Sequence, residues 1–399
     1  MAMGYKGALF AAVAASAFAW TASASAQDIV LGLAMVKSGP LKSVGEATET
    51  SVDIAVEEIN AKGGINGKKI KLVKFDTGSD PKQAATATQK FAQDDNALAI
   101  IGPFSSGEAA VAFPVGERIG IIQMPNAAST PGLTANFSYA WRLTADEGKQ
   151  FNRLIATLRN KQIKIEKAEI IYVSDERVSN ISGTQFYPAI LKANNVAFGE
   201  PVAVQYKSFD VAPQVAQVLE RKPDVVALAA TPDSAGKVIK ELRRQGFQGR
   251  VIGSQIFADP NALELFGRDA DGLLIVAGYW SDRNDATRSF TKKFADENAK
   301  RGLVTKKIPH HTDAQAYDIV YLLKQAMEKA GVTGDPAKVA AERTAIREAM
   351  KGIRFTGVTG DGTCFNAARD AQLPGFVIEI KDLKWNLFDQ HAADPCPAS

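Results

Sequence analysis

The sequence alternates short apolar runs with helix-forming segments over most of its length, and this alternation limits the fold most strongly. The runs Ile29–Met35 and Ala97–Ile101 are typical of strands buried on both faces of a parallel sheet. Helices with cap and stop signals separate such runs, as at Asp80-Pro81 and Gly63-Gly64. Repeated strand–helix units build parallel sheets covered by helices, and these strands are too many for one ordinary open sheet. The sequence therefore predicts an α/β fold divided into two lobes.

Composition and charge exclude several classes of partner and reaction. The chain has 399 residues, enough for two domains with their own cores, and a net charge of +3 without basic clusters. Such a charge does not favour nucleic acid or an anionic membrane as a partner. The chain has three histidines and lacks the G-x-S-x-G, H-E-x-x-H, Walker and G-x-G-x-x-G motifs. We therefore expect a protein that is not an enzyme and that needs no cofactor and no metal. We also expect a monomer.

The first 26 residues have the features of an export signal. Lys6 precedes the short apolar run Ala8–Trp20, and Ala24-Ser25-Ala26 fits an A-x-A cleavage site. The apolar run is too short to span a bilayer. We expect cleavage after Ala26 and a periplasmic location for the mature chain.

The two cysteines, Cys364 and Cys396, both lie near the C-terminus. In an oxidising compartment an isolated pair favours a disulfide over a metal site or a catalytic thiol. The predicted bond closes a short loop and holds a tail that would otherwise fray.

One helix start is a candidate anion site. Gly102-Pro103 ends the run Ala97–Ile101, and Ser105 then stands at the start of a helix. A serine caps free backbone N–H groups there, and the partial positive charge of a helix N-terminus suits a carboxylate. The alternative is a simple cap in which Glu108 settles the helix dipole.

Several motifs with their spacing resemble type I periplasmic solute-binding proteins of the branched-chain amino acid class, which serve ABC transporters. The resemblance covers nearly the whole mature chain. The motifs are Ser38-Gly39-Pro40, Glu58–Gly67, Asp76 with Asp80–Ala84, Ile101–Pro103 with Ser105–Gly107, Pro125–Ser129 and Ala316–Asp318.

The resemblance implies two Rossmann-like lobes with parallel sheets, joined by three crossovers, with the ligand in the cleft between them. Lobe 1 would comprise residues 28–147 and 279–354, and lobe 2 residues 148–278 and 355–399. The cleft would lie at the carboxyl ends of the strands, where α/β sheets generally bind ligands.

The resemblance also assigns candidate ligand-binding residues. Ser105 stands where the family holds the ligand carboxylate, and Ala127 and Ser129 match residues that supply further contacts. The candidate set drawn from these and neighbouring positions is Phe104, Ser105, Ser106, Ala127, Ala128, Ser129, Thr231 and Gln255, with Val44, Arg177 and His311 as weaker candidates.

The chain departs from the family at the position that holds the ligand ammonium. Gln255 stands where amino-acid binders have an acid, and Val44 and Thr231 replace frequent tyrosines. An amide offers a buried ammonium no Coulomb attraction. The alternatives are a shifted alignment or another acid, for which Glu46, Asp175, Glu176 and Asp233 are candidates.

Three further residues have both a binding and an ordinary interpretation. Phe104 replaces a family cysteine, so its ring either faces an apolar ligand or is a core residue. His311 either hydrogen-bonds a phenol or carboxylate or is a polar loop residue. Arg177 either meets a charged ligand or is a surface arginine.

These observations predict the solute-binding component of an ABC importer, which works with a membrane permease. The expected ligand is a small carboxylate, an aromatic acid without an α-amino group, as in family members that bind aromatic carboxylates. The alternatives are a binding protein for branched-chain or other amino acids or amides, and an exported ligand-sensing subunit.

Overall fold

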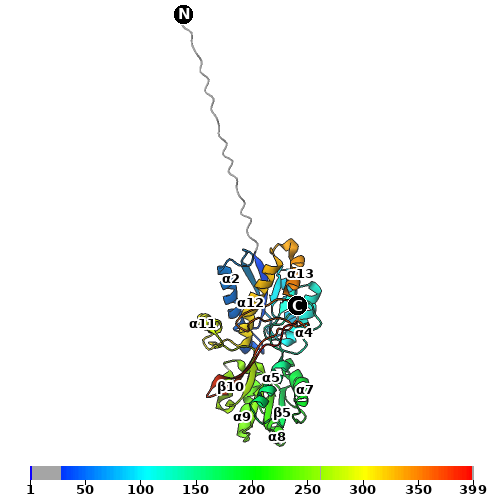
Figure 1. The fold of residues 1–399 in the computed structure, drawn as a ribbon, viewed down its shortest axis with the longest axis vertical. Coiled ribbons are helices and arrows are strands. Elements are labelled where there is room, and N and C mark those ends of the chain that lie inside the picture. The colour runs from blue at the N-terminus through cyan, green and yellow to red at the C-terminus, as the bar shows by residue number, and fades with distance from the viewer. Residues whose placement is uncertain (2–27, 261, 398–399) are drawn as a thin grey trace.

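The computed structural model describes residues 1, 28–260 and 262–397. Residues 2–26 of the predicted export signal lie outside them. Among the described helices, none is long and apolar enough to cross a membrane. Figure 1 shows two α/β bodies, one above the other, each built around its own sheet.

The first sheet has four parallel strands in the order β2-β1-β3-β4. Side chains alternate between its faces, so Leu31 and Leu33 meet α2 and α12 while Ala34 meets α3. The strands are β1 (Ile29–Met35), β2 (Ile70–Asp76), β3 (Ala99–Ile101) and β4 (Ile122–Met124). The helices of this unit are α1 (Lys42–Gly45), α2 (Thr48–Ala61), α3 (Pro81–Gln93), α4 (Ser106–Ile119), α11 (Asp285–Lys300), α12 (His311–Ala330) and α13 (Val339–Met350).

The second sheet has seven strands in the order β11-β10-β9-β8-β7-β5-β6. The strands from β5 to β9 are parallel, and the hairpin of β10 and β11 adds an antiparallel edge to β9. The strands are β5 (Ala168–Val173), β6 (Val202–Val204), β7 (Val225–Ala229), β8 (Arg250–Gly253), β9 (Leu274–Ala277), β10 (Gly375–Lys381) and β11 (Lys384–His391). The helices are α5 (Glu147–Asn160), α6 (Arg177–Ile181), α7 (Tyr187–Ala193), α8 (Ala212–Leu219), α9 (Pro232–Arg244) and α10 (Ala262–Phe266).

The chain passes between the two sheets after β4, after β9 and before β10, so the predicted two-lobed α/β fold with three crossovers is confirmed. The packing differs from the expected boundaries at the C-terminal end. Phe355, Phe365 and Leu373 lie in the core of the first unit, although residues 355–399 were expected in lobe 2. The apolar side chains of this segment find their partners on Trp141 and α12. We propose that only β10 and β11 of this segment belong to lobe 2.

Two helices end or continue in special conformations. Helix α4 runs to Ile119 and ends at Gly120, which takes a left-handed conformation with φ of 79°. Helix α6 begins at Arg177 and continues through a π-helical turn, Ser182–Phe186. There the backbone of Gly183 lies so close to Tyr172 that a Cβ would be 2.3 Å from it.

The predicted disulfide joins Cys364 to Cys396, with their Cα atoms 5.9 Å apart. After β11 the chain therefore returns to the first unit (Figure 1).

Thiol titration of unfolded, unreduced protein from the periplasm should find no free thiol. Because the loop spans 32 residues, chain entropy predicts that the double variant Cys364→Ser/Cys396→Ser loses ~3 to 4 kcal/mol of unfolding free energy. Reduced wild type should unfold like this variant, and two titratable thiols in exported protein would contradict the assignment.

Candidate ligand-binding site

A cavity lies between the two units, at the carboxyl ends of their strands. Ser105 follows β3, Ala127 follows β4, Glu176 follows β5, Thr231 follows β7 and Ser254 follows β8. In each sheet the connections change direction near the cavity, which is where open α/β sheets bind ligands. The lining residues are Leu41, Phe104, Ser105, Ser106, Ala127, Ser129, Glu176, Val178, Ser179, Ser182, Ala229, Ala230, Thr231, Ser254, Gln255, Ile256, His311 and Thr312.

The cavity is small in this conformation. The space open to the centres of water molecules is about 40 Å³, whereas an engineered apolar cavity that holds benzene measures about 150 Å³. A ring-sized ligand therefore needs the two units to separate or the lining side chains to move.

Three long helices start at this cavity. The first turns of α4, α9 and α12 contribute Ser106, the cap residue Thr231, and His311. Helix N-termini carry partial positive charge and unpaired N–H groups. Thr231 makes no side-chain cap hydrogen bond, so α9 lacks the capping contact that α4 and α12 have. The electrostatic field of these helix ends favours an anion.

Ser105 lines the cavity and also caps α4. Its hydroxyl donates to Glu108 Oε2 at 2.6 Å and accepts from the Glu108 N–H at 3.3 Å. Burial raises the pKa of Glu108, against hydrogen bonds from Ser105 and Thr77 that lower it. The Ser105 hydroxyl is therefore engaged within the chain in this conformation, as the simple-cap alternative predicted.

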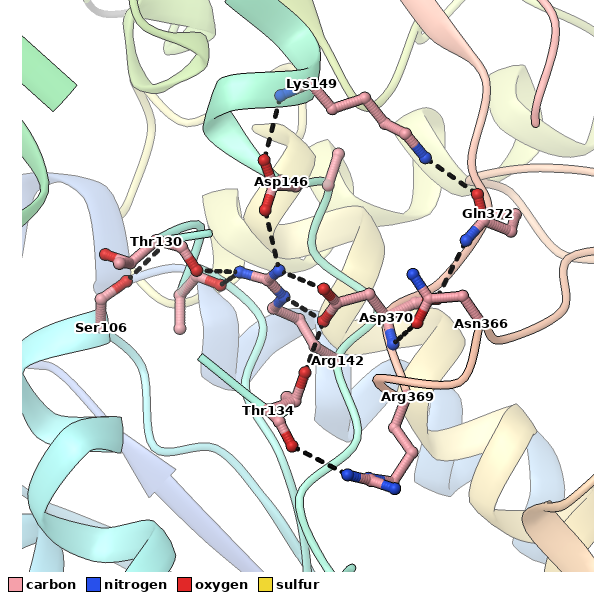
Figure 2. Close-up of polar contacts among 12 residues, drawn as sticks. Ser106, Thr130, Thr134, Arg142, Asp146, Lys149, Asn366, Arg369, Asp370 and Gln372 are labelled. Carbon is pink, nitrogen blue, oxygen red and sulfur yellow. Dashed lines mark hydrogen bonds and ion pairs between the residues drawn. The ribbon is translucent and has the colours of Figure 1, made fainter. Parts of the chain in front are cut away.

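Arg142, which is fully buried, holds the loop that carries Ser129. Arg142 donates to the carbonyls of Ala128 and Thr130 at 3.1 and 2.6 Å. It also forms a bidentate pair with Asp370, at 2.8 and 2.7 Å. Figure 2 shows the guanidinium at the centre of this network, with the Thr130 N–H donating to Ser106 Oγ at 3.2 Å. The network joins the start of α4, the 128–130 loop and the returning C-terminal segment.

Gln255 lies at the predicted departure from the family. Its Nε2 donates to the Ala145 carbonyl at 2.9 Å, and its Oε1 has no partner among the described residues. Beside it is Glu147, a fully enclosed carboxyl whose pKa is raised by burial, against hydrogen bonds from Ser254, Tyr187 and Gln255. The Tyr187 hydroxyl donates to Glu147 Oε1 at 3.1 Å. Glu147 gives no signal in the sequence, because the first turn of a helix is an ordinary place for a glutamate.

One of the four alternative acids, Glu176, lines the cavity. Its Oε1 accepts from the Val178 N–H at 3.0 Å, and its Oε2 accepts from the N–H and hydroxyl of Ser179 at 2.8 and 2.6 Å. The other three, Glu46, Asp175 and Asp233, are not among the lining residues. The carboxylate that faces the cavity is thus already committed to the start of α6.

The two histidines are buried rather than exposed in a loop. His310 caps α12 and His311 is its first residue; each is 3% exposed. Burial lowers the pKa of His310 to about 3, and it lowers that of His311 well below its usual value, so both rings are neutral. Burial also raises the pKa of Asp313, in the same turn, to about 7.

The cavity brings together eight of the predicted residues and leaves out three. Ala128 is a core residue whose carbonyl binds Arg142, and Val44 packs against Phe104. Arg177 is exposed beside Gly107. Each of these three residues lies against a neighbour distant in sequence. The eight lining residues are Phe104, Ser105, Ser106, Ala127, Ser129, Thr231, Gln255 and His311.

Lys306 connects the two units beside the cavity. This nearly buried ammonium lies 3.3 Å from Asp259, which follows β8, and 4.0 Å from Glu46, which follows α1. It also donates to the Ser43 carbonyl. Ions removed from water need a partner, and this ammonium finds its partners on both units.

A second, larger cavity of about 370 Å³ shares His311 with the first. Its other walls are mainly apolar, including Tyr279, Trp280, Ile378 and Trp385. Of the three helix starts, that of α12 reaches this cavity and those of α4 and α9 do not, so the field that favours an anion is weaker there.

Two α/β units that enclose a cleft at their strand ends define a bilobal binding protein. The chain belongs to the periplasmic binding protein family, whose model matches residues 28–384. It is 28% identical to the Leu/Ile/Val-binding protein BraC3 of Rhizobium johnstonii, over 88% of this chain and 92% of that protein. The resemblance to the branched-chain amino acid class is thereby confirmed.

Solved structures share the fold. A leucine-binding protein LivK from Thermotoga maritima superposes with a TM-score of 0.78 at 20% identity, covering 91% of this chain and 99% of that one. A solute-binding protein of an ABC transporter from Rhodopseudomonas palustris, in complex with 3,4-dihydroxybenzoic acid, also gives 0.78, at 19% identity, covering 93% and 99%.

Proposed function

We propose that this chain is the solute-binding component of an ABC importer and captures an aromatic carboxylate without an α-amino group. The mature protein starts at Gln27 in the periplasm, acts as a monomer, and delivers its ligand to a membrane permease. The eight lining residues named above, among them Ser106, Ser129 and Gln255, form the binding site.

The convergence of three helix N-termini on one cavity carries the proposal of an anionic ligand. The starts of α4, α9 and α12 all face the space between the units. Their partial charges and the hydroxyls of Ser129 and Thr231 favour a carboxylate. These groups are held on helix and strand ends, so they lose little entropy on binding.

The carboxyl groups at the cavity argue against a ligand with an α-amino group. The lining carboxylate, Glu176, already accepts three hydrogen bonds, and Glu147 is enclosed with a raised pKa. An ammonium beside Gln255 would be poorly compensated, at a cost of several kcal/mol. Phe104, Ile256 and Leu41 supply apolar walls that suit a ring.

A branched-chain amino acid is the second candidate ligand. The relative BraC3 is named for Leu/Ile/Val binding. In this chain Glu176 lines the cavity and would have to accept the ammonium in addition to its three present donors.

Calorimetry with benzoate, cinnamate and leucine tests the proposal. We expect leucine to bind at least a hundredfold more weakly than the better aromatic acid, a difference of about 3 kcal/mol. Ser129→Ala should weaken binding of the acid, whereas Ser138→Ala, an exposed serine, should not. Trp385→Leu, in the larger cavity, should also leave the affinity unchanged. Micromolar binding of leucine with no response to either aromatic acid would reject the proposal.

A further inference from the structure

Buried polar atoms without partners gather around the inner part of the cavity. Gln255 Oε1, His311 Nδ1, and both Nε2 and Oε1 of Gln315 have no hydrogen-bond partner among the described residues. The same holds for Ser182 Oγ, which lines the cavity, for Glu147 Oε2, beside Gln255, and for His310 Nε2 and Asp313 Oδ1, at the start of α12. Gln255, His311 and Gln315 are at most 3% exposed. Unpaired buried polar groups are rare in folded proteins because each forfeits its hydrogen bonds to water. Such a concentration indicates a partner that the chain itself does not supply.

These atoms come from both units and meet at one place. Gln255 and His311 line the cavity, and Gln315 lies one turn after His311 on the same face of α12. A Cβ built on Gly278 would lie 3.1 Å from Gln315 Nε2 and 3.9 Å from Gln255 Oε1. The two amides therefore flank the same glycine.

The chemistry of this cluster is neutral. Two amides and a neutral imidazole offer donors and acceptors without a net charge. The neighbouring ionisable groups are Glu147, beside Gln255; His310, whose ring lies against that of His311; Asp313, in the same turn of α12; and Lys306, which is paired with Asp259. A second carboxylate on a ligand would find the enclosed acid and no uncommitted cation among these groups. A neutral group that both donates and accepts would satisfy the unpaired atoms.

We propose that Gln255, His311 and Gln315 form a subsite for a neutral hydroxyl or amide group on the ligand, distinct from its carboxylate. The inference rests on the proposed function, because it assumes a carboxylate ligand in the same cavity. It narrows the ligand class to monocarboxylates that carry a second, uncharged hydrogen-bonding group, such as hydroxybenzoates.

The test compares affinities for benzoate, 3-hydroxybenzoate, 4-hydroxybenzoate and terephthalate by calorimetry. We expect at least one hydroxybenzoate to bind about tenfold or more tightly than benzoate, because it pairs buried atoms that benzoate leaves unpaired. Terephthalate, with a second carboxylate, should bind more weakly than benzoate and more weakly than that hydroxybenzoate. The readout is the ratio of the hydroxybenzoate affinity to the benzoate affinity, because a change that weakens the binding of both acids equally leaves this ratio unchanged.

Matched variants locate the subsite. Gln315→Leu and Gln255→Leu keep side-chain size and should bring the hydroxybenzoate-to-benzoate ratio close to one. Gln325→Leu makes the same change at an exposed position of the same helix and should keep the wild-type ratio. Thermal unfolding of each variant confirms that it is folded.

The outcomes separate the inference from the proposed function. Equal affinities for benzoate and both hydroxybenzoates in the wild type would overturn the inference, with water serving the unpaired atoms, and leave the proposed function intact. A preference for hydroxybenzoate over benzoate that persists in both Gln315→Leu and Gln255→Leu would also overturn the inference. Binding of terephthalate that is tighter than binding of benzoate would overturn it as well. Failure of every aromatic acid to bind would overturn the proposed function and the inference together.

Discussion

Replacement of Arg142 by methionine should destabilise the protein by about 3 to 5 kcal/mol, because the partly buried carboxylate of Asp370 and two buried carbonyls would lose their donor. Arg142 is fully buried, and all its contacts go to groups that remain in place: Asp370, Asp146 and the carbonyls of Ala128 and Thr130. Urea unfolding measures the loss. Arg142→Lys should rescue little, since one ammonium cannot reproduce the planar, bidentate contact with Asp370.

The variant should also bind ligand more weakly, because the 128–130 loop and Ser106 are held through this network (Figure 2). Arg118→Met, at an exposed arginine of α4, is the matched control and should change stability by less than about 0.5 kcal/mol. Where Arg142→Met fails to fold, Asp370→Asn tests the same pair with almost no change in shape. Wild-type stability in both network variants would contradict the role given to Arg142.

Replacement of Lys306 by methionine should separate the two units in the absence of ligand. The ammonium joins Glu46 and the Ser43 carbonyl of one unit to Asp259 of the other. Truncating one partner of a buried charge pair costs roughly 2 to 5 kcal/mol. The radius of gyration from X-ray scattering should therefore rise in the variant, and saturating ligand should lower it again, because a ligand that bridges both units stabilises the closed state.

The neighbouring Lys307→Met is the control, because Lys307 is exposed and makes no ion pair with any of the residues that the structure describes. Its scattering curve should match that of the wild type. The Lys306–Asp259 pair stabilises the closed arrangement of the two units, so its loss should weaken ligand binding by Lys306→Met. We expect a decrease in affinity of at least tenfold, which corresponds to about 1.4 kcal/mol. An unchanged radius of gyration and an unchanged affinity would mean that closure does not depend on this cluster.

Much of the fold could be predicted because its signals are local. The bounds of β1 and β5 follow from apolar runs of strand length, and the bounds of α3 follow from Asp80-Pro81. The cysteine pair was predictable because the chain offers a single pairing. Ser105 was predictable as a helix start at a strand end, so its place at the cavity follows from the general rule for α/β sheets.

The features that the sequence did not predict have one common origin: they depend on contacts between residues distant in sequence. Residues 355–373 follow the last expected helix of lobe 1 and lack strong periodicity, so their attachment to the first core appears only when Phe365 is seen against Trp141. His311 was weighed as a loop residue because a polar side chain gives no local sign of burial. Arg142 and Glu147 gave no signal at all, since charged residues are usually exposed.

The sequence by itself determined the two α/β units, the parallel direction of most of their strands, and the positions at which strand ends and helix starts meet. These depend on periodicity, caps and turns within a few neighbouring residues. Tertiary structure alone decided which polar groups are paired. Arg142 meets Asp370 across 228 residues, Lys306 meets Asp259 across 47, and Gln255 meets Ala145 across 110. Such contacts depend on how two sheets pack in space, and that packing also decides which groups of the cleft remain available to a ligand.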